Sequence, residues 1–286
     1  MTIAQDSRFA PKRILCPLDL SGTSRTVLEW ANLFAEAFQA KLDLLHTEWP
    51  EYPPYFLPSQ EVELESESEQ RRKTMTEEVS KLARETLGKS VSFEIAILEG
   101  YPVEAILARA SSEKVDMIVM GSHGRSGFSR LRLGSVAESV VRATTIATLV
   151  TRAHADAKPA KIERVLCPVS PTKTSHKGLK LAAEVAETFR AQLFVLHATE
   201  EGSFDLEAKH RELCQWIPAE IRDRCDLVEV VRHGTEAEQI LLAAREKAVD
   251  LIVMEAGRRP ILDVSILGTT AERVVRHADP AVLLIS

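Results

Sequence analysis

The sequence predicts an α/β protein that consists of two tandem three-layer domains. Short apolar segments alternate with segments of helical spacing, which is the order found in a parallel sheet with crossover helices. The same order of segments occurs twice along the chain. The length of 286 residues accommodates two ordinary domains, and 45% hydrophobic residues supply enough apolar surface for their cores.

An internal duplication organises the chain. The segment RILCPLD at Arg13–Asp19 recurs as RVLCPVS at Arg164–Ser170, which is an offset of 151 residues. The segment VDMIVM at Val115–Met120 recurs as VDLIVM at Val249–Met254, where the offset is 134 residues. The first copy therefore carries 17 more residues (151 − 134) between these landmarks. A two-copy repeat of this size indicates tandem domains rather than a solenoid.

The boundary between the copies lies in a polar, alanine-rich stretch that contains a proline. We place this linker at about residues 153–161, because apolar periodicity is absent there. The expected domains are residues 1–152 and 162–286.

Each copy contains five expected strands. They are rich in Ile, Leu and Val and alternate poorly between apolar and polar residues, as expected of strands that helices cover on both faces. In the first copy they lie at about 13–18, 41–46, 91–98, 115–120 and 146–151.

Helices are expected between these strands. Residues Thr26–Ala40 show helical spacing of apolar side chains. Residues Pro102–Ala110 begin with a proline, which suits the first turn of a helix. A charged helix is expected at about Glu61–Leu87. It follows residues 48–58, where four prolines argue against a helix or a central strand. This stretch is compatible with a surface loop that packs its own aromatic side chains, and also with a lid or partner-binding loop.

The charge and the apolar segments argue against several classes of protein. The formal net charge of −6 argues against a general nucleic-acid-binding protein, which needs a basic face. No segment reaches the roughly 18 to 20 consecutive apolar residues that span a bilayer. The first residues, MTIAQDSRFAPKR, lack the apolar region of a signal peptide. We therefore expect a soluble, cytoplasmic protein without a membrane partner.

The four cysteines include neither a CxxC pair nor a Cys/His cluster with the usual zinc spacing. We therefore assign no side chain to a metal site. Cys16 and Cys167 each end an apolar run, so we expect buried free thiols rather than a structural disulfide.

Residues 120–135 read MGSHGRSGFSRLRLGS and contain four of the chain's 12 glycines, three arginines and no acidic residue. The stretch begins where the fourth strand stops, and ligands bind beyond the carboxyl ends of the strands in an open parallel sheet. Backbone N–H groups in such a loop can form an anion-binding nest. Ser135 and Glu138 have capping-box spacing, which predicts Ser135 as a helix N-cap. A helix N-terminus favours anions, so the stretch predicts a phosphate site.

The glycines follow the spacing Gly-x2-Gly-x9-Gly-Ser at Gly121, Gly124, Gly134 and Ser135. This is neither the Walker pattern nor GxGxxG. At this point the sequence resembles the universal stress protein family, which carries Gly-x2-Gly-x9-Gly-[Ser/Thr] after its fourth strand as an ATP-binding signature. The resemblance covers nearly the whole chain in both copies. It implies an adenine nucleotide alpha hydrolase-like fold, with a five-stranded, mostly parallel sheet between helical layers in each domain.

The resemblance implies an ATP site in the first copy. Asp19 is expected to contact the adenosine part, through adenine or ribose. Pro17, Leu18 and Thr47 would line the adenine slot, and Met120 would close it. Mg²⁺ or Mn²⁺ is expected on the phosphates. The residues expected around the ribose and phosphates are Gly121, His123, Gly124, Arg125, Gly134, Ser135 and Val136.

Two of these residues have a structural alternative. Asp19 can simply cap the following helix, and His123 can be a solvated loop residue. Arg130 and Arg132 add positive charge to the same loop.

The second copy departs from the pattern. Glu255 and Arg258 replace the first two glycines, and Ser170 replaces Asp19. A glutamate at the phosphate end of the site repels phosphate, so we predict that the second copy does not bind ATP in the same way. Family members commonly pair through their last strands, which implies that the two halves pair within the chain. A further homodimer is left open, and the protein partner is unknown.

The leading interpretation is a tandem universal stress protein that binds ATP in its first domain and acts as a nucleotide-responsive stress and signalling protein. One alternative is an enzyme on the same fold, such as a slow ATP hydrolase. An ATP pyrophosphatase or adenylating enzyme would need an SGGxDS-like loop, and LDLSGTS at 18–24 lacks the paired glycines. No spacing identifies a catalytic set. The other alternative is a ligand-free protein-interaction module.

Overall fold

The computed structural model describes residues 8–48, 61–122, 133–152, 161–171, 176–199, 205–257, 259–261, 264–266 and 268–285. The loop expected at 48–58 falls almost entirely outside the described residues, as do most of the linker and the centre of the glycine-rich stretch.

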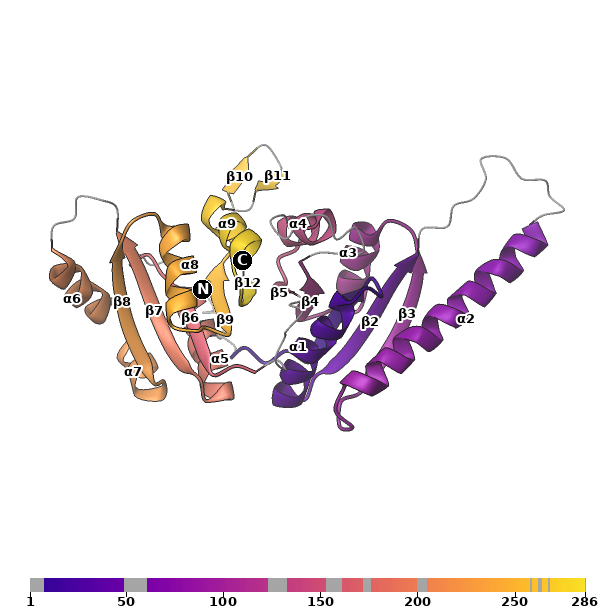
Figure 1. Cartoon of the computed structure of the whole chain (residues 1–286), viewed down its shortest axis with the longest axis horizontal. Coiled ribbons are helices and arrows are strands. Elements are labelled where there is room, and N and C mark those ends of the chain that lie inside the picture. Colours follow the sequence, from indigo (N-terminus) through magenta and orange to yellow (C-terminus); the bar gives the residue numbers. More distant parts are fainter. Residues whose placement is uncertain are drawn as a thin grey trace, which may run out of the picture.

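One ten-stranded sheet runs through the described chain in the order β3-β2-β1-β4-β5-β12-β9-β6-β7-β8 (Figure 1). Strands in each half pair in parallel, and β5 pairs with β12 antiparallel where the two halves meet. The strands of the first copy are β1 (Arg13–Leu18), β2 (Lys41–Glu48), β3 (Phe93–Glu99), β4 (Met117–Gly121) and β5 (Ala147–Thr151). The second copy contributes β6 (Arg164–Pro168), β7 (Gln192–Thr199), β8 (Leu227–His233), β9 (Leu251–Glu255) and β12 (Ala281–Ile285) to this sheet. It also forms a separate antiparallel pair of short strands, β10 (Arg259–Ile261) and β11 (Val264–Ile266).

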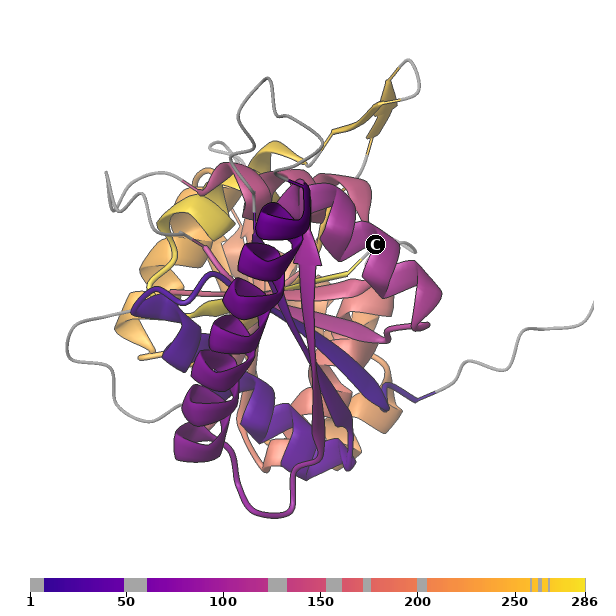
Figure 2. The same cartoon turned by 90° about the vertical axis from the view of Figure 1, so that its right-hand side faces the viewer.

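Helices cover both faces of the sheet. One face carries α1 (Thr23–Phe38), α2 (Glu61–Thr86), α5 (His176–Phe189), α6 (Leu206–Trp216) and α7 (Ala219–Arg224). The other face carries α3 (Pro102–Ser112), α4 (Ser135–Ala143), α8 (Glu236–Glu246) and α9 (Thr269–His277). The long helix α2 packs against the edge strand β3 (Figure 2). The predicted α/β class and the tandem three-layer arrangement are confirmed.

The strand pleat divides the core into two apolar clusters. Ile14 and Cys16 of β1 belong to the cluster under α1, whereas Leu15 belongs to the cluster under α3 and α4. This alternation is the two-residue period of a strand. Because both side-chain rows are buried and apolar, the segment reads as a continuous apolar run in the sequence.

The helices form where their apolar side chains face the sheet. Val27, Ala31 and Phe34 of α1 are buried at helical spacing. The helix ends at Gln39, which adopts a left-handed conformation with φ of 54° and donates its N–H to the carbonyl of Ala35. Arg190 ends α5 with the same φ of 54°.

All four cysteines are free, and Cys16 and Cys167 are buried, as predicted. Burial raises the pKa of both buried thiols above the ordinary range. Within the described residues, no helix is both long enough and apolar enough to cross a membrane.

Candidate functional site

The candidate site lies at the carboxyl ends of β1, β2 and β4. Strand β1 lies between β2 and β4 in the sheet, so the chain leaves β1 toward one side and later returns on the other. This is the topological switch point at which open α/β sheets bind ligands. In the register of β1 and β2, Leu18 is level with His46, and Thr47 follows one residue later. Met120 and Gly121 end β4 beside them.

Asp19 organises the turn between β1 and α1. Its Oδ1 accepts hydrogen bonds from the Ser21 N–H at 3.1 Å, the Ser21 hydroxyl at 2.7 Å and the Ser24 hydroxyl at 3.0 Å. The N-cap position of α1 is Gly22, with no side-chain cap, so Asp19 is not the N-cap in the strict sense. The carboxylate instead closes a local turn over the start of the helix.

A buried histidine ties the end of β2 to this turn. His46 Nδ1 lies 2.7 Å from the Leu18 carbonyl oxygen, and its second-copy counterpart, His197, lies 3.0 Å from the Val169 oxygen. A carbonyl acceptor requires the proton on Nδ1 in both rings. Sequence reasoning did not assign a role to His46. The repetition of the histidine in LDLLHT and LFVLHA was the signal that marked it.

The base of the glycine-rich loop is closed by backbone hydrogen bonds. Ser122 donates its N–H to the Thr151 carbonyl at 2.7 Å, and Gly134 donates to the Ser122 carbonyl at 2.6 Å. The predicted residues His123, Gly124 and Arg125 lie outside the described residues, together with Arg130 and Arg132.

The glycine at the end of this loop is Gly134 in the first copy and Gly268 in the second, and the structure gives Gly268 a packing role. In the second copy, Gly268 donates to the Ala256 carbonyl at 2.9 Å, which repeats the bond made by Gly134. A Cβ atom on Gly268 would lie 3.0 Å from the Gly257 oxygen and 3.2 Å from the Ala256 oxygen. Close backbone approach therefore explains the glycine at this position of the second copy, even though that copy lacks the other two glycines.

The N-cap predicted at Ser135 is wrong by one residue. Gly134 is the N-cap of α4, with φ of −63° and ψ of 145°, and its carbonyl accepts the Glu138 N–H at 3.0 Å. Glu138 forms no capping box but pairs with Arg142 at 2.6 Å. Ser135 and Val136 are consequently the first two helical residues. Their N–H groups have no partner within the helix, which leaves them available to an anion at this edge.

The second copy has a cavity of about 410 Å³ at the equivalent edge. Each described residue of the predicted ATP site has its counterpart among the residues that line this cavity. These counterparts, at offsets of 151 or 134, are Pro168, Val169, Ser170, Ala198, Met254, Glu255, Gly268, Thr269 and Thr270. The structure therefore places Pro17, Leu18, Asp19, Thr47, Met120, Gly121, Gly134, Ser135 and Val136 at one edge of the sheet.

Two carboxylates change the character of the cavity in the second copy. Glu255 accepts the Gly178 N–H of α5 at 3.0 Å, so it occupies the start of that helix. Glu236 accepts the Thr270 hydroxyl at 3.0 Å and the Ser170 hydroxyl at 3.4 Å. Negative charge therefore stands at the end of the cavity where the first copy has Gly121.

The comparison with known protein families assigns both copies to the same family. The model of the universal stress protein family matches residues 11–152 and 161–286. Universal stress protein MJ0531 of Methanocaldococcus jannaschii is 30% identical over 141 residues, covering 49% of this chain and 82% of that protein. Universal stress protein MJ0577 of the same organism is 31% identical over 156 residues, covering 49% and 94%.

A solved structure shows the same fold over nearly the full length. The crystal structure of a universal stress protein from Archaeoglobus fulgidus matches with a TM-score of 0.69 and 22% identity, covering 97% of this chain and 96% of its own. A second structure, from Pseudomonas aeruginosa, matches with a TM-score of 0.68 at 20% identity, covering 96% and 93%.

Proposed function

Because this chain belongs to the universal stress protein family, with two copies of the family domain in tandem, we propose that it is a nucleotide-responsive stress protein. ATP binds to the first domain, residues 1–152. The second domain, residues 162–286, does not bind ATP in the same way. Binding orders the glycine-rich loop and alters a surface that a protein partner reads.

The nucleotide would lie across the carboxyl edge of β1 and β4. The apolar residues Pro17, Leu18 and Met120 offer faces for the adenine ring, and Thr47 offers a hydroxyl. Asp19 is held in place by the Ser21 and Ser24 donors, with the carboxylate at the strand end. A fixed carboxylate at this position suits a ribose or adenine donor.

The phosphates would lie at the start of α4. Ser135 and Val136 offer backbone N–H groups there, Gly121 and Gly134 let the backbone come close to a ligand, and His123, Gly124 and Arg125 of the loop would complete the cradle. These groups form a donor set without acidic side chains, which fits an anion. Mg²⁺ or Mn²⁺ would be held by the phosphates and water, because Mg²⁺ keeps several of its waters.

One observation carries the proposal. The nine described residues of the site correspond, position by position, to the lining of the cavity in the second copy. The second copy thus shows that this edge of the fold can form a cavity. The change that separates the copies is chemical, since Gly121 becomes Glu255 and Asp19 becomes Ser170.

Titration calorimetry with ATP and Mg²⁺ tests the proposal on the wild type and on two matched variants. Gly121→Glu imitates the second copy, and Glu255→Gly reverses the change there. Juxtaposed like charges cost several kcal/mol, so we expect Gly121→Glu to weaken binding on the order of 100-fold. Glu255→Gly should leave the wild-type site unchanged. Unchanged affinity in Gly121→Glu, with the fold intact by circular dichroism, would contradict the proposed site.

The same titration separates the alternatives. A protein-interaction module without a ligand gives no heat with any adenine nucleotide. A slow ATP hydrolase gives binding followed by phosphate release over hours, which Gly121→Glu should abolish.

A further inference from the structure

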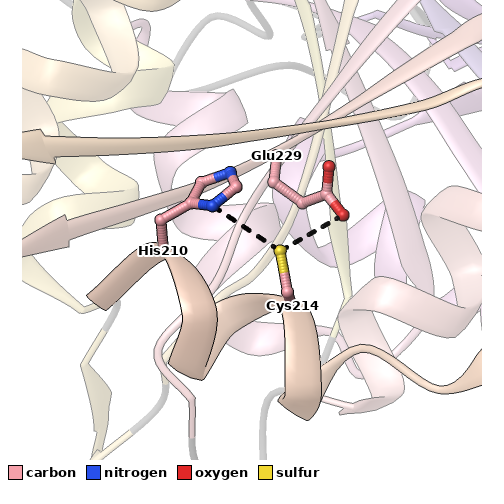
Figure 3. Close-up of side chains that lie close together, drawn as sticks. All are labelled: His210, Cys214 and Glu229. Atoms are coloured by element: carbon pink, nitrogen blue, oxygen red, sulfur yellow. Dashed lines mark hydrogen bonds between the residues drawn. The ribbon is translucent and has the colours of Figure 1, made fainter. Parts of the chain in front are cut away.

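We propose that His210, Cys214 and Glu229 of the second domain form a binding site for a divalent transition metal of the zinc class. The three side chains lie close together and come from α6 and β8 (Figure 3). Their ligand atoms all lie within 4.8 Å of one another. Strand β8 is at one edge of the sheet, and the candidate nucleotide site lies in the other half of the strand order.

The helix places two ligands on one face. His210 and Cys214 are four residues apart in α6, which is one helical turn, so both point toward β8. Glu229 rises from β8 to meet them. In the first copy the long helix α2 occupies the corresponding stretch of chain, whereas the second copy has the shorter helices α6 and α7. The cluster is thus specific to the second copy.

The distances match tetrahedral coordination. The Cys214 Sγ lies 3.7 Å from His210 Nδ1 and 3.6 Å from Glu229 Oε1. A zinc ion with a Zn–S bond of about 2.3 Å and Zn–N or Zn–O bonds of about 2.0–2.2 Å holds such ligand atoms about 3.6 Å apart. The third pair of ligand atoms, on the His210 imidazole and the Glu229 carboxylate, lies within 4.8 Å.

The donor set selects the class of metal. A thiolate, an imidazole and a carboxylate together suit Zn²⁺ and Co²⁺, whereas Mg²⁺ and Ca²⁺ prefer oxygen ligands alone. Three protein ligands leave the fourth position to water. A cavity of about 610 Å³ that His210 and Glu229 help to line gives the ion and its water a path to solvent.

An arginine holds the carboxylate in place. Arg222 forms an ion pair with Glu229 Oε1 and donates to the Cys214 carbonyl at 2.6 Å. It therefore connects the strand to the end of α6 as an outer partner that orients a ligand. When the metal binds, the Cys214 thiol releases its proton to solvent, and His210 must present an unprotonated Nδ1. Metal affinity should accordingly rise with pH.

Titration of the untagged protein with Co²⁺ tests this site. We expect about one Co²⁺ per chain with a thiolate-to-cobalt charge-transfer band in the near ultraviolet, and Zn²⁺ should displace it. Cys214→Ser should remove the band, and His210→Ala and Glu229→Gln should each weaken binding at least tenfold.

Cys225→Ser is the matched control. Cys225 is the other partly exposed thiol and contacts the Ala183 carbonyl at 3.6 Å, away from the cluster. This variant should bind Co²⁺ as the wild type does. Absence of the band in the wild type would overturn the proposal, as would persistence of the band in Cys214→Ser. Wild-type affinity in either His210→Ala or Glu229→Gln would overturn the three-ligand arrangement.

Discussion

Replacement of Asp43 by alanine should strongly destabilise the first domain. Asp43 is fully buried in β2. Its carboxylate accepts hydrogen bonds from Arg109 Nε at 2.8 Å and Nη2 at 3.2 Å. It accepts a further hydrogen bond from Arg13 Nη2 at 3.2 Å. The hydrogen bonds that Arg109 donates to Asp43 raise the pKa of its guanidinium. Both arginines also pair with Glu113, at 2.8 Å from Arg13 and 3.2 Å from Arg109, and with Glu94.

The magnitude follows from this geometry. Removing one partner of a buried ion pair costs about 3–5 kcal/mol. Glu94 and Glu113 remain to face the two arginines, so we expect the lower end, about 3 kcal/mol. In a domain of this size, each kcal/mol lowers the Tm by roughly 2–4 °C. Asp43→Ala should therefore lower the Tm by roughly 6–12 °C.

The second copy supplies a compensated variant. At the positions of Asp43, Glu94 and Arg109 it carries Phe194, Val228 and Ala243. Replacing a buried ion network by apolar residues of similar volume is often neutral or stabilising. The triple substitution Asp43→Phe, Glu94→Val and Arg109→Ala should hence recover at least half of the loss.

The free energy of unfolding of both variants can be measured by urea unfolding, and their Tm by thermal unfolding monitored with circular dichroism. The control variant is Lys161→Ala, which breaks an exposed ion pair with Glu163. That control should cost less than about 1 kcal/mol. A cost below about 1 kcal/mol for Asp43→Ala would show that the buried carboxylate does not stabilise the domain, and a triple variant less stable than the single one would show that the apolar set does not compensate for it.

Other features of the structure give three further expectations. The Cys16 thiol is buried and its pKa is raised, so a maleimide should label Cys214 within minutes and Cys16 only after unfolding, as peptide mapping by mass spectrometry would reveal. His46→Ala removes the hydrogen-bond donor to the buried Leu18 carbonyl. This change should lower the free energy of unfolding in urea by about 1–3 kcal/mol and weaken ATP binding. An unchanged stability would show that the bond is dispensable. Burial alone would raise the pKa of Glu229, but the hydrogen bond from Arg222 holds it below the ordinary value. That contribution is present above the ordinary Glu pKa and is lost as the pH falls through the lowered one. The destabilisation caused by Arg222→Gln should therefore be larger at neutral pH than at strongly acidic pH, where only the hydrogen bond from Arg222 to the Cys214 carbonyl is lost.

The fold was predictable because the duplication repeats the same physical pattern twice. Strands covered on both faces appear as apolar runs, and the expected strand positions in the first copy match β1 to β5 within a few residues. Asp43 was not recognised because it stands alone within an apolar run. Its arginine partners come from β1 and α3, and only the folded chain brings them together.

The candidate site was predictable in part. The glycine spacing and strand ends located the described residues at one edge of the sheet, but the sequence favoured Ser135 as the N-cap because a hydroxyl suits that role better than Gly134. The bond between Glu255 and Gly178 joins residues 77 positions apart, so spacing could not reveal it. The His210, Cys214 and Glu229 cluster was missed for the same reason, since a strand supplies its third member.

We propose one working nucleotide site per chain, in the first domain. The most direct measurement is to denature freshly purified protein and to quantify the released nucleotide by chromatography, with Mg²⁺ and ATP added beforehand and excess removed. We expect about one adenine nucleotide per chain in the wild type and a loss of bound nucleotide in Gly121→Glu. Two per chain would contradict the assignment of the second domain. A protein that carries none, and binds none on titration, would contradict the nucleotide site itself.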